Sequence, residues 1–156
     1  MTVTAVDTSI LLDILIPNQL FIESSLKKLS DAANKGRTIV CDLVYAELSS
    51  QFNSLNDLNK FLLEIHTDIS IVKQESLFYA GQLWRSYKTN KYTKYYCPSC
   101  GTNIKIECDN CKYNITIPKR VLNDFIIGAH AKNQANQFLT RDRGFYRHYF
   151  KDLEII

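Results

Sequence analysis

The sequence predicts an α/β fold in which helices cover both faces of a parallel sheet. Short apolar runs, expected to be strands, alternate along the chain with segments of helical periodicity. These runs are continuously apolar rather than alternating, which is typical of strands buried on both faces. With 156 residues, 46% apolar and 22% charged, the chain is long enough for one domain with a sizeable core.

The first predicted strand covers residues 3–6, an apolar run that ends on the carboxylate Asp7. A short helix is expected in DTSILLDILIP, with Asp7, Thr8 or Ser9 near its N-cap and Pro17 after its end. A buried strand that stops on an acid has two explanations. The acid caps the following helix, or it serves chemistry at the edge of the sheet.

The remaining elements follow the same alternation. A helix is expected in NQLFIESSLKKLSDAANKG, with Ile22, Leu26, Leu29 and Ala33 at helical spacing and Gly36 as its stop. Further strands are expected at 38–41, 69–72, 137–140 and 153–156. Further helices are expected in DLVYAELSSQF with Asp42 as a cap, in LNDLNKFLLEIH, in QESLFYAGQLWRSYK, from Pro118 in a first turn to Ala135, and in GFYRHYF.

Two acids follow predicted strands, and ligands of open α/β sheets collect at the carboxyl ends of strands. Asp7 follows the first strand, and Asp142 follows the strand QFLT. If these strands are neighbours, the two carboxylates share one edge of the sheet. The alternatives are a helix cap for Asp7 and a turn for Asp142.

Two further acids lie within predicted helices. Asp124 shares a helix face with apolar residues and is expected to point inward, unless it pairs with Arg120 four residues earlier. Glu47 lies at the margin of a buried stripe or is solvated. Four such carboxylates repel one another, and a divalent cation offsets that repulsion. Ligand sets made only of oxygen atoms suit Mg²⁺ or Mn²⁺, and such a site can activate water against a phosphate.

Four motifs carry a resemblance to a known family. VDTSILLDIL, CDLVYAELSS, RVLNDFIIGAHA and FLTRDRGFYRHYF occur in this order. Together they closely resemble the PIN-domain nucleases, in particular the VapC-type toxins of toxin–antitoxin pairs. The resemblance covers about residues 1–85 and 118–156. It implies a Rossmann-like three-layer α/β/α sandwich and Mg²⁺- or Mn²⁺-dependent cleavage of RNA.

The resemblance also assigns residues. The family's four catalytic and metal-binding acids fall on Asp7, Glu47, Asp124 and Asp142. The hydroxyl position before the fourth acid falls on Thr140. Some relatives have a fifth acid where this chain has Gly144. Thr8 and Ser9 can support Asp7 or cap the helix, and capping is the role we expect.

An insert at residues 92–117 interrupts the single predicted domain of residues 1–156. It holds two C-x₂-C pairs separated by seven residues, Cys97, Cys100, Cys108 and Cys111. Such pairs suit a closed, structural Cys₄ zinc site, and the insert resembles a short zinc ribbon. Disulfides are the alternative. Cys41 stands apart and is expected to be a buried apolar residue.

Positive charge gathers around the insert. Residues 85–120 hold 8 Lys or Arg and 2 Asp or Glu, against 11 and 14 in the remainder. Such a segment suggests an anionic partner. Alternating cations and aromatics suit contact with single-stranded RNA, and the candidate contacts are Arg85, Lys88, Lys91, Tyr92 and Lys94. A rigid structural or dimer-contact arm is the equally weighted alternative.

The sequence therefore predicts a metal-dependent endoribonuclease, the toxin of a type II toxin–antitoxin system. Its expected partners are RNA and an antitoxin, and the family implies a homodimer. No apolar stretch approaches a membrane span and the N-terminus does not resemble a signal peptide, so we expect a cytoplasmic protein. The alternatives are a housekeeping PIN nuclease of RNA processing and a non-catalytic PIN module that binds RNA or protein.

Overall fold

The computed structural model describes residues 1–89, 95–96, 100, 102–104, 107–113 and 121–156. The strands are β1 (Thr2–Val6), β2 (Gly36–Cys41), β3 (Thr67–Ser70), β4 (Tyr95–Tyr96), β5 (Asn103–Ile104), β6 (Gln137–Leu139) and β7 (Glu154–Ile155). The helices are α1 (Thr8–Leu15), α2 (Ile22–Lys35), α3 (Asp42–Ser49), α4 (Leu55–Glu64), α5 (Gln74–Thr89), α6 (Leu122–Gln134) and α7 (Arg143–Tyr149).

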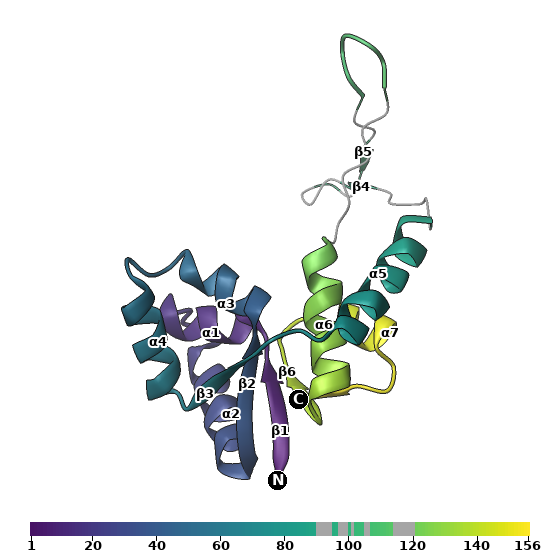
Figure 1. Ribbon diagram of the computed structural model, residues 1–156. Helices are drawn as coiled ribbons and strands as arrows, with labels where there is room; N and C mark the ends of the chain where they lie inside the picture. The colour runs from purple at the N-terminus through teal and green to yellow at the C-terminus, as the bar shows by residue number, and fades with distance from the viewer. Residues whose placement is uncertain (90–94, 97–99, 101, 105–106, 114–120) are drawn as a thin grey trace.

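Five of these strands form one parallel sheet with the order β3-β2-β1-β6-β7. Helices α1 to α4 gather on one side of it and α5 to α7 on the other, so the fold has three layers (Figure 1). The predicted α/β sandwich is confirmed. Strand order reverses between β1 and β6, and such a switch point is where open α/β sheets bind ligands.

The central strands explain why the sequence reads as apolar runs. Ala5 and Val6 of β1 and Ile39 and Val40 of β2 are each at most 2% exposed, because helices cover both faces of the sheet. Leu11 of α1 is fully buried against the same sheet region. This packing fixes the position of the residue that follows β1.

A second cluster of aromatic side chains joins α5, α6 and α7. Phe125 of α6 is fully buried, and its ring centroid lies 5.1 to 5.6 Å from four other rings. These rings belong to Trp84, Tyr87, Phe145 and Tyr149. Tilted and edge-to-face ring pairs of this kind stabilise a core beyond the burial of their area. The cluster therefore holds the first turns of α6 and α7 in a fixed relation.

Gly128 allows α6 to lie close to the end of α7. A Cβ atom added at Gly128 would lie 2.4 Å from a ring carbon of Phe150, whose side chain is almost fully buried. Such a contact is too short for any real Cβ, and a buried ring has little room to move. The glycine is thus required by a close approach rather than by its backbone angles.

Several predicted boundaries were wrong. β3 is Thr67–Ser70 instead of 69–72, because the parallel ladder pairs Thr38 with Thr67 and Cys41 with Ser70. Helix α6 begins at Leu122 because Val121 has extended backbone angles, so the first turn does not reach back to Pro118, which lies outside the described residues.

Two predicted roles in helices were also wrong. In α2 the buried face holds Ser25, Leu29 and Ala32, while Leu26 is 45% exposed. Asp42 does not cap α3; it is the first residue of the helix, and its Oδ1 atom accepts a hydrogen bond from the backbone N–H of Val72. In the described part of the chain, no helix is long and apolar enough to cross a membrane.

Candidate active site at the carboxyl end of the sheet

Asp7 and Asp142 meet at one edge of the sheet because β1 and β6 are neighbours, as predicted. The backbone N–H of Asp7 donates to the carbonyl of Leu139 over 2.9 Å, which continues the ladder one residue beyond β1. Thr140 then donates its hydroxyl to Asp7 Oδ2 over 2.6 Å, and the backbone N–H of Asp142 donates to the same hydroxyl over 3.1 Å. Thr140 therefore links the two acidic positions.

Asp7 is a buried carboxylate, 7% exposed. Burial raises the pKa of Asp7 above its usual range, hydrogen bonds from Thr140 and Ser9 oppose the increase, and the charge of Glu47 adds to it. The hydroxyl of Ser9 donates to Asp7 Oδ2 over 2.7 Å. The two hydroxyl donors hold this carboxylate in one orientation. Its burial costs solvation free energy.

Glu47 of α3 is brought to the same place through Thr8. The Thr8 hydroxyl donates to Glu47 Oε2, and the Glu47 side chain is half-buried. Our expectation that Thr8 and Ser9 cap α1 was wrong: Asp7 occupies the N-cap position, no side chain caps the helix, and the two hydroxyls bind the carboxylates of Glu47 and Asp7 instead. A carboxylate accepts a stronger hydrogen bond than a neutral group does.

Asp124 and Asp142 each lie at the first turn of a helix and are half-buried. Asp124 Oδ2 accepts from the backbone N–H of Val121 over 3.2 Å. Asp142 is the N-cap of α7 and its Oδ1 accepts from the backbone N–H of Phe145 over 3.4 Å. Helix α6 begins at the end of the sandwich where β1 ends (Figure 1). Both carboxylates are oriented by helix termini, which favour negative charge.

The four predicted acids are not equally close. Asp7 and Glu47 interact electrostatically, and a hydroxyl links Asp7 to the backbone of Asp142. No group of three or more Asp, Glu, His or Cys side chains among the described residues is close enough to hold a metal ion. Their chemistry nevertheless fits Mg²⁺ or Mn²⁺: the donors are all oxygen, and a buried carboxylate beside a second one is offset by a divalent cation.

An ion pair between a buried acid and an exposed arginine, beside these acids, was missed by the sequence reasoning. Asp13 of α1 is 2% exposed, pairs with Arg141 Nε over 3.2 Å and accepts a 2.7 Å hydrogen bond from Ser25. The guanidinium of Arg141 lies over the ring of Phe21, 4.6 Å from its centroid. The pair holds the segment between Thr140 and α7 against α1 and α2. The sequence signal that could have revealed this pair is Asp13, an acid within the apolar run ILLDIL.

Three of the four cysteines of the insert are described, and Cys97 lies outside the described residues. Cys108 and Cys111 are free thiols, and Cys100 Sγ donates to the hydroxyl of Thr102 over 3.2 Å. Backbone N–H groups of Cys111 and Asn110 lower the pKa of Cys108, and the Cys111 side chain lowers it further. Cys41 behaves differently, since burial raises its pKa to about 11. The thiol of Cys108 therefore favours the thiolate, while Cys41 is the expected buried residue.

The backbone of the second C-x₂-C pair forms a tight turn. The N–H of Lys112 donates to the carbonyl of Cys108 over 2.9 Å, and the N–H of Cys108 donates to the carbonyl of Tyr113 over 2.9 Å. Lys112 has a φ of 57°, in the left-handed region that favours glycine. The corresponding residue after the first pair is Gly101. The turn directs backbone N–H groups at the sulfur of Cys108.

Only part of the predicted RNA-contact segment is described. Arg85 and Lys88 are exposed on α5, and Lys88 Nζ lies 5.5 Å from the centroid of the Trp84 ring. Lys91, Tyr92 and Lys94 lie outside the described residues. Lys88 thus extends from the side of α5 that carries the aromatic cluster.

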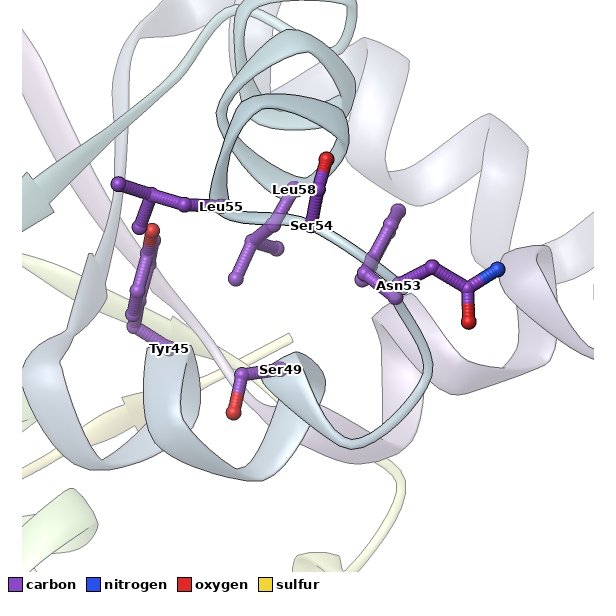
Figure 2. Close-up of a pocket in the computed structure, with 7 residues that line it drawn as sticks. Tyr45, Ser49, Asn53, Ser54, Leu55 and Leu58 are labelled. Carbon is purple, nitrogen blue, oxygen red and sulfur yellow. The ribbon is translucent and has the colours of Figure 1, made fainter.

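A hollow between α3 and α4 is a poor candidate for the chemistry. Its volume is about 220 Å³, and Figure 2 shows Tyr45 and Ser49 of α3 on one side of it and Leu58 of α4 on the other. Among the described residues no charged side chain lines this hollow, so they offer nothing there to hold a metal ion or an anion. The carboxyl end of the sheet remains the candidate active site.

Comparisons with known proteins agree with the fold. A family model for the PIN domain matches residues 4–151. The structure is similar to VapBC2 from Rickettsia felis bound to a DNA fragment from their promoter, with a TM-score of 0.61, 17% identity and coverage of 99% of this chain and 97% of that one. It is also similar to VapBC-1 from nontypeable Haemophilus influenzae, with a TM-score of 0.59, 13% identity and coverage of 99% and 96%. No curated protein sequence matches the chain.

Proposed function

The chain belongs to the PIN domain family, and from this we propose that it is a metal-dependent endoribonuclease and the toxin of a toxin–antitoxin pair. The observation that carries the proposal is the linkage of Asp7 to the Asp142 position through Thr140, at the sheet's switch point. A buried acid at a sheet edge whose carboxylate has a raised pKa, as Asp7 has, is typical of a functional site.

Asp7, Glu47, Asp124 and Asp142 would hold one or two Mg²⁺ or Mn²⁺ ions. Bound there, the metal would polarise the scissile phosphate and lower the pKa of an attacking water. The protein's own contribution is orientation. Thr140 and Ser9 fix the Asp7 carboxylate, Thr8 fixes Glu47, and the helix termini fix Asp124 and Asp142.

The chemistry is tested first with Asp124→Asn. Wild-type protein is expected to cleave at least one RNA in a panel of tRNA, rRNA and mRNA with Mg²⁺ or Mn²⁺, and to be inactive in EDTA. The variant is expected to be slower by at least about a hundred-fold, since the lost charge stabilisation amounts to several kcal/mol. Gel analysis of end-labelled RNA measures both.

Asp31→Asn is the matched control, because Asp31 is an exposed acid on α2, outside the candidate site. The control is expected to cleave at the wild-type rate. Cleavage that persists in EDTA, or that Asp124→Asn leaves unchanged, would contradict the assignment. A folded protein that binds RNA but cleaves nothing would favour the alternative of a binding module.

The antitoxin partner is supported by the similar VapBC structures and by the surface of α1 and α2. Four large apolar side chains there are between 40% and 84% exposed: Ile16, Leu20, Phe21 and Leu26. Exposed apolar surface of this kind often marks a protein–protein contact. The partner would be a small protein that covers this surface.

Residues 92–117 would form the zinc-ribbon insert, with one structural Zn²⁺ held by Cys97, Cys100, Cys108 and Cys111. The antiparallel pair β4–β5 supports this, as do the turn at Cys108 and the lowered pKa of its thiol. Zinc binds the deprotonated thiolate, and a fragment this small gains its folding energy from the metal.

Purified protein is expected to contain about one zinc ion per chain, the capacity of a single Cys₄ site. Cys108→Ser should lose that zinc because it removes one of four ligands, whereas Cys41→Ala should keep it. Zinc is measured by atomic emission or with a chromogenic indicator after thiol modification. A zinc-free protein from reducing, zinc-supplemented conditions would overturn the zinc ribbon.

A further inference from the structure

A second hollow adjoins the candidate active site between α1, α2 and the start of α7. It has a volume of about 310 Å³. Three cationic side chains and three hydroxyl side chains line it: Lys28, Arg141, Arg143, Ser24, Ser25 and Thr140. Thr140 is the residue that donates to Asp7, so the hollow opens directly beside the acids.

The charges of this hollow are unbalanced. In the part of the chain that the structure describes, no acidic side chain lines it. Arg141 is paired with Asp13, but neither Lys28 nor Arg143 takes part in any ion pair among the described residues. Partial burial lowers the pKa of Lys28, and the nearby charge of Arg143 lowers it further. Two like charges brought together without a counter-ion favour an anion between them.

The position of Lys28 and Arg143 suits a phosphate of a strand that is bound at the acids. Arg143 directly follows Asp142 and is the first residue of α7, while Lys28 reaches the hollow from α2. Arg141 keeps its place by pairing with Asp13 and stacking on Phe21, so the wall behind the cations is rigid. A strand held with one phosphate at the acids would pass the next phosphate along this wall.

We propose that Lys28 and Arg143 form a subsite for a backbone phosphate of RNA, one that neighbours the phosphate at the acids. The proposal rests on the nuclease function proposed above and adds where the substrate strand runs. Lysine and arginine bind phosphate through charge-assisted hydrogen bonds, and such contacts position the strand without reading its sequence. The subsite should therefore contribute equally for every RNA sequence.

The test measures binding of a fluorescent single-stranded RNA to the slow-cleaving Asp124→Asn protein in Mg²⁺, at several salt concentrations. Two double variants are compared in this background. The subsite double carries Lys28→Gln and Arg143→Gln, and the control double carries Lys27→Gln and Arg147→Gln. Both doubles remove the same charge from α2 and α7, but Lys27 and Arg147 are exposed and do not line the hollow. Both pairs lie on the surface, and circular dichroism verifies the fold.

The subsite double is expected to bind RNA about tenfold more weakly for each lost contact. The slope of log affinity against log salt should decrease by about 0.7, since the subsite neutralises one phosphate and each neutralised phosphate on a single strand contributes about 0.7. The control double should keep nearly the whole slope. Equal weakening by both doubles, no weakening by either, or a wild type that binds no RNA would overturn the subsite.

Cleavage by wild-type protein, measured in parallel, separates the two proposals. If the wild type cleaves RNA and the subsite double binds RNA as tightly as its parent, the nuclease proposal stands and the subsite proposal is overturned. Selective loss of binding in a protein that cleaves nothing supports the phosphate subsite and overturns the nuclease. If both hold, the subsite double in the active background should raise KM more than it lowers kcat.

Discussion

Replacing Asp7 with asparagine is expected to lower the rate of metal-dependent RNA cleavage by at least about a hundred-fold. Asparagine has nearly the shape of aspartate and can keep hydrogen bonds to Thr140 and Ser9, so the loss reports the missing charge. Asp7 is the most buried of the four acids, and two hydroxyls, those of Ser9 and Thr140, orient its carboxylate. Single-turnover cleavage in Mg²⁺ measures the effect.

The same substitution is expected to stabilise the metal-free protein at neutral pH. The pKa of Asp7 is raised in the folded state, so the folded protein holds this proton more tightly than the unfolded chain does. The contribution of Asp7 is therefore most favourable below its unfolded pKa and is lost as pH rises through its folded pKa. Above that pH the ionised carboxylate lowers the free energy of unfolding, and asparagine removes this penalty.

Urea unfolding in EDTA at a series of pH values tests the stability effect. The wild type should lose stability relative to Asp7→Asn as pH rises through the folded pKa, and added Mg²⁺ should raise the midpoint of the wild type more than that of the variant. Thr140→Val, which removes a hydrogen bond but no charge, should retain a response to Mg²⁺. An Asp7→Asn protein that cleaves normally would show that the acid has no part in the reaction.

Phe125→Ala is expected to lower the free energy of unfolding by about 3 to 5 kcal/mol, the range for truncating a fully buried phenylalanine. Phe125 lies at the centre of the aromatic cluster and contacts rings from α5 and α7. Its loss leaves a cavity between the three helices. Because α6 and α7 carry Asp124 and Asp142, cleavage should fall together with stability.

Phe125→Leu is the matched control, since it retains most of the buried volume and should cost less than about 1.5 kcal/mol if the neighbouring rings repack. Chemical denaturation followed by far-ultraviolet circular dichroism measures both variants. A loss below about 1 kcal/mol for the alanine variant would mean that the cluster is not a cooperative part of the core. Replacement of the exposed Phe78 by alanine should have little effect.

The sheet and its acidic edge could be predicted because both follow from local sequence. Buried parallel strands require continuous apolar runs, and Asp7 and Asp142 follow such runs directly. Whether β1 and β6 are neighbours depends on the order of strands, which no local pattern encodes. The four motifs supplied that information through their resemblance to a family. The homodimer and the cytoplasmic location stay predictions.

Tertiary contacts decided the features that were predicted wrongly or missed. The hydroxyl of Thr8 could either cap its own helix or bind a distant carboxylate. It binds Glu47 because of where α3 lies. The pairing of Asp13 with Arg141 joins residues far apart in the chain. The buried face of α2 shifted for a related reason, since Ser25 turns inward to bind Asp13. Such choices depend on neighbours that a single sequence does not specify.

The order of the sheet also has a consequence for how the protein is made. β1 leaves the ribosome well before its neighbour β6, and Asp7 and Thr140 are 133 residues apart in the chain. Domains form from the N-terminus onward during synthesis. The Asp7 carboxylate therefore lacks its hydrogen bond from Thr140 until residue 140 has been synthesised. A nascent chain that stops before Asp142 cannot assemble the acidic edge. The proposed nuclease activity would therefore begin only after Asp142 has been synthesised.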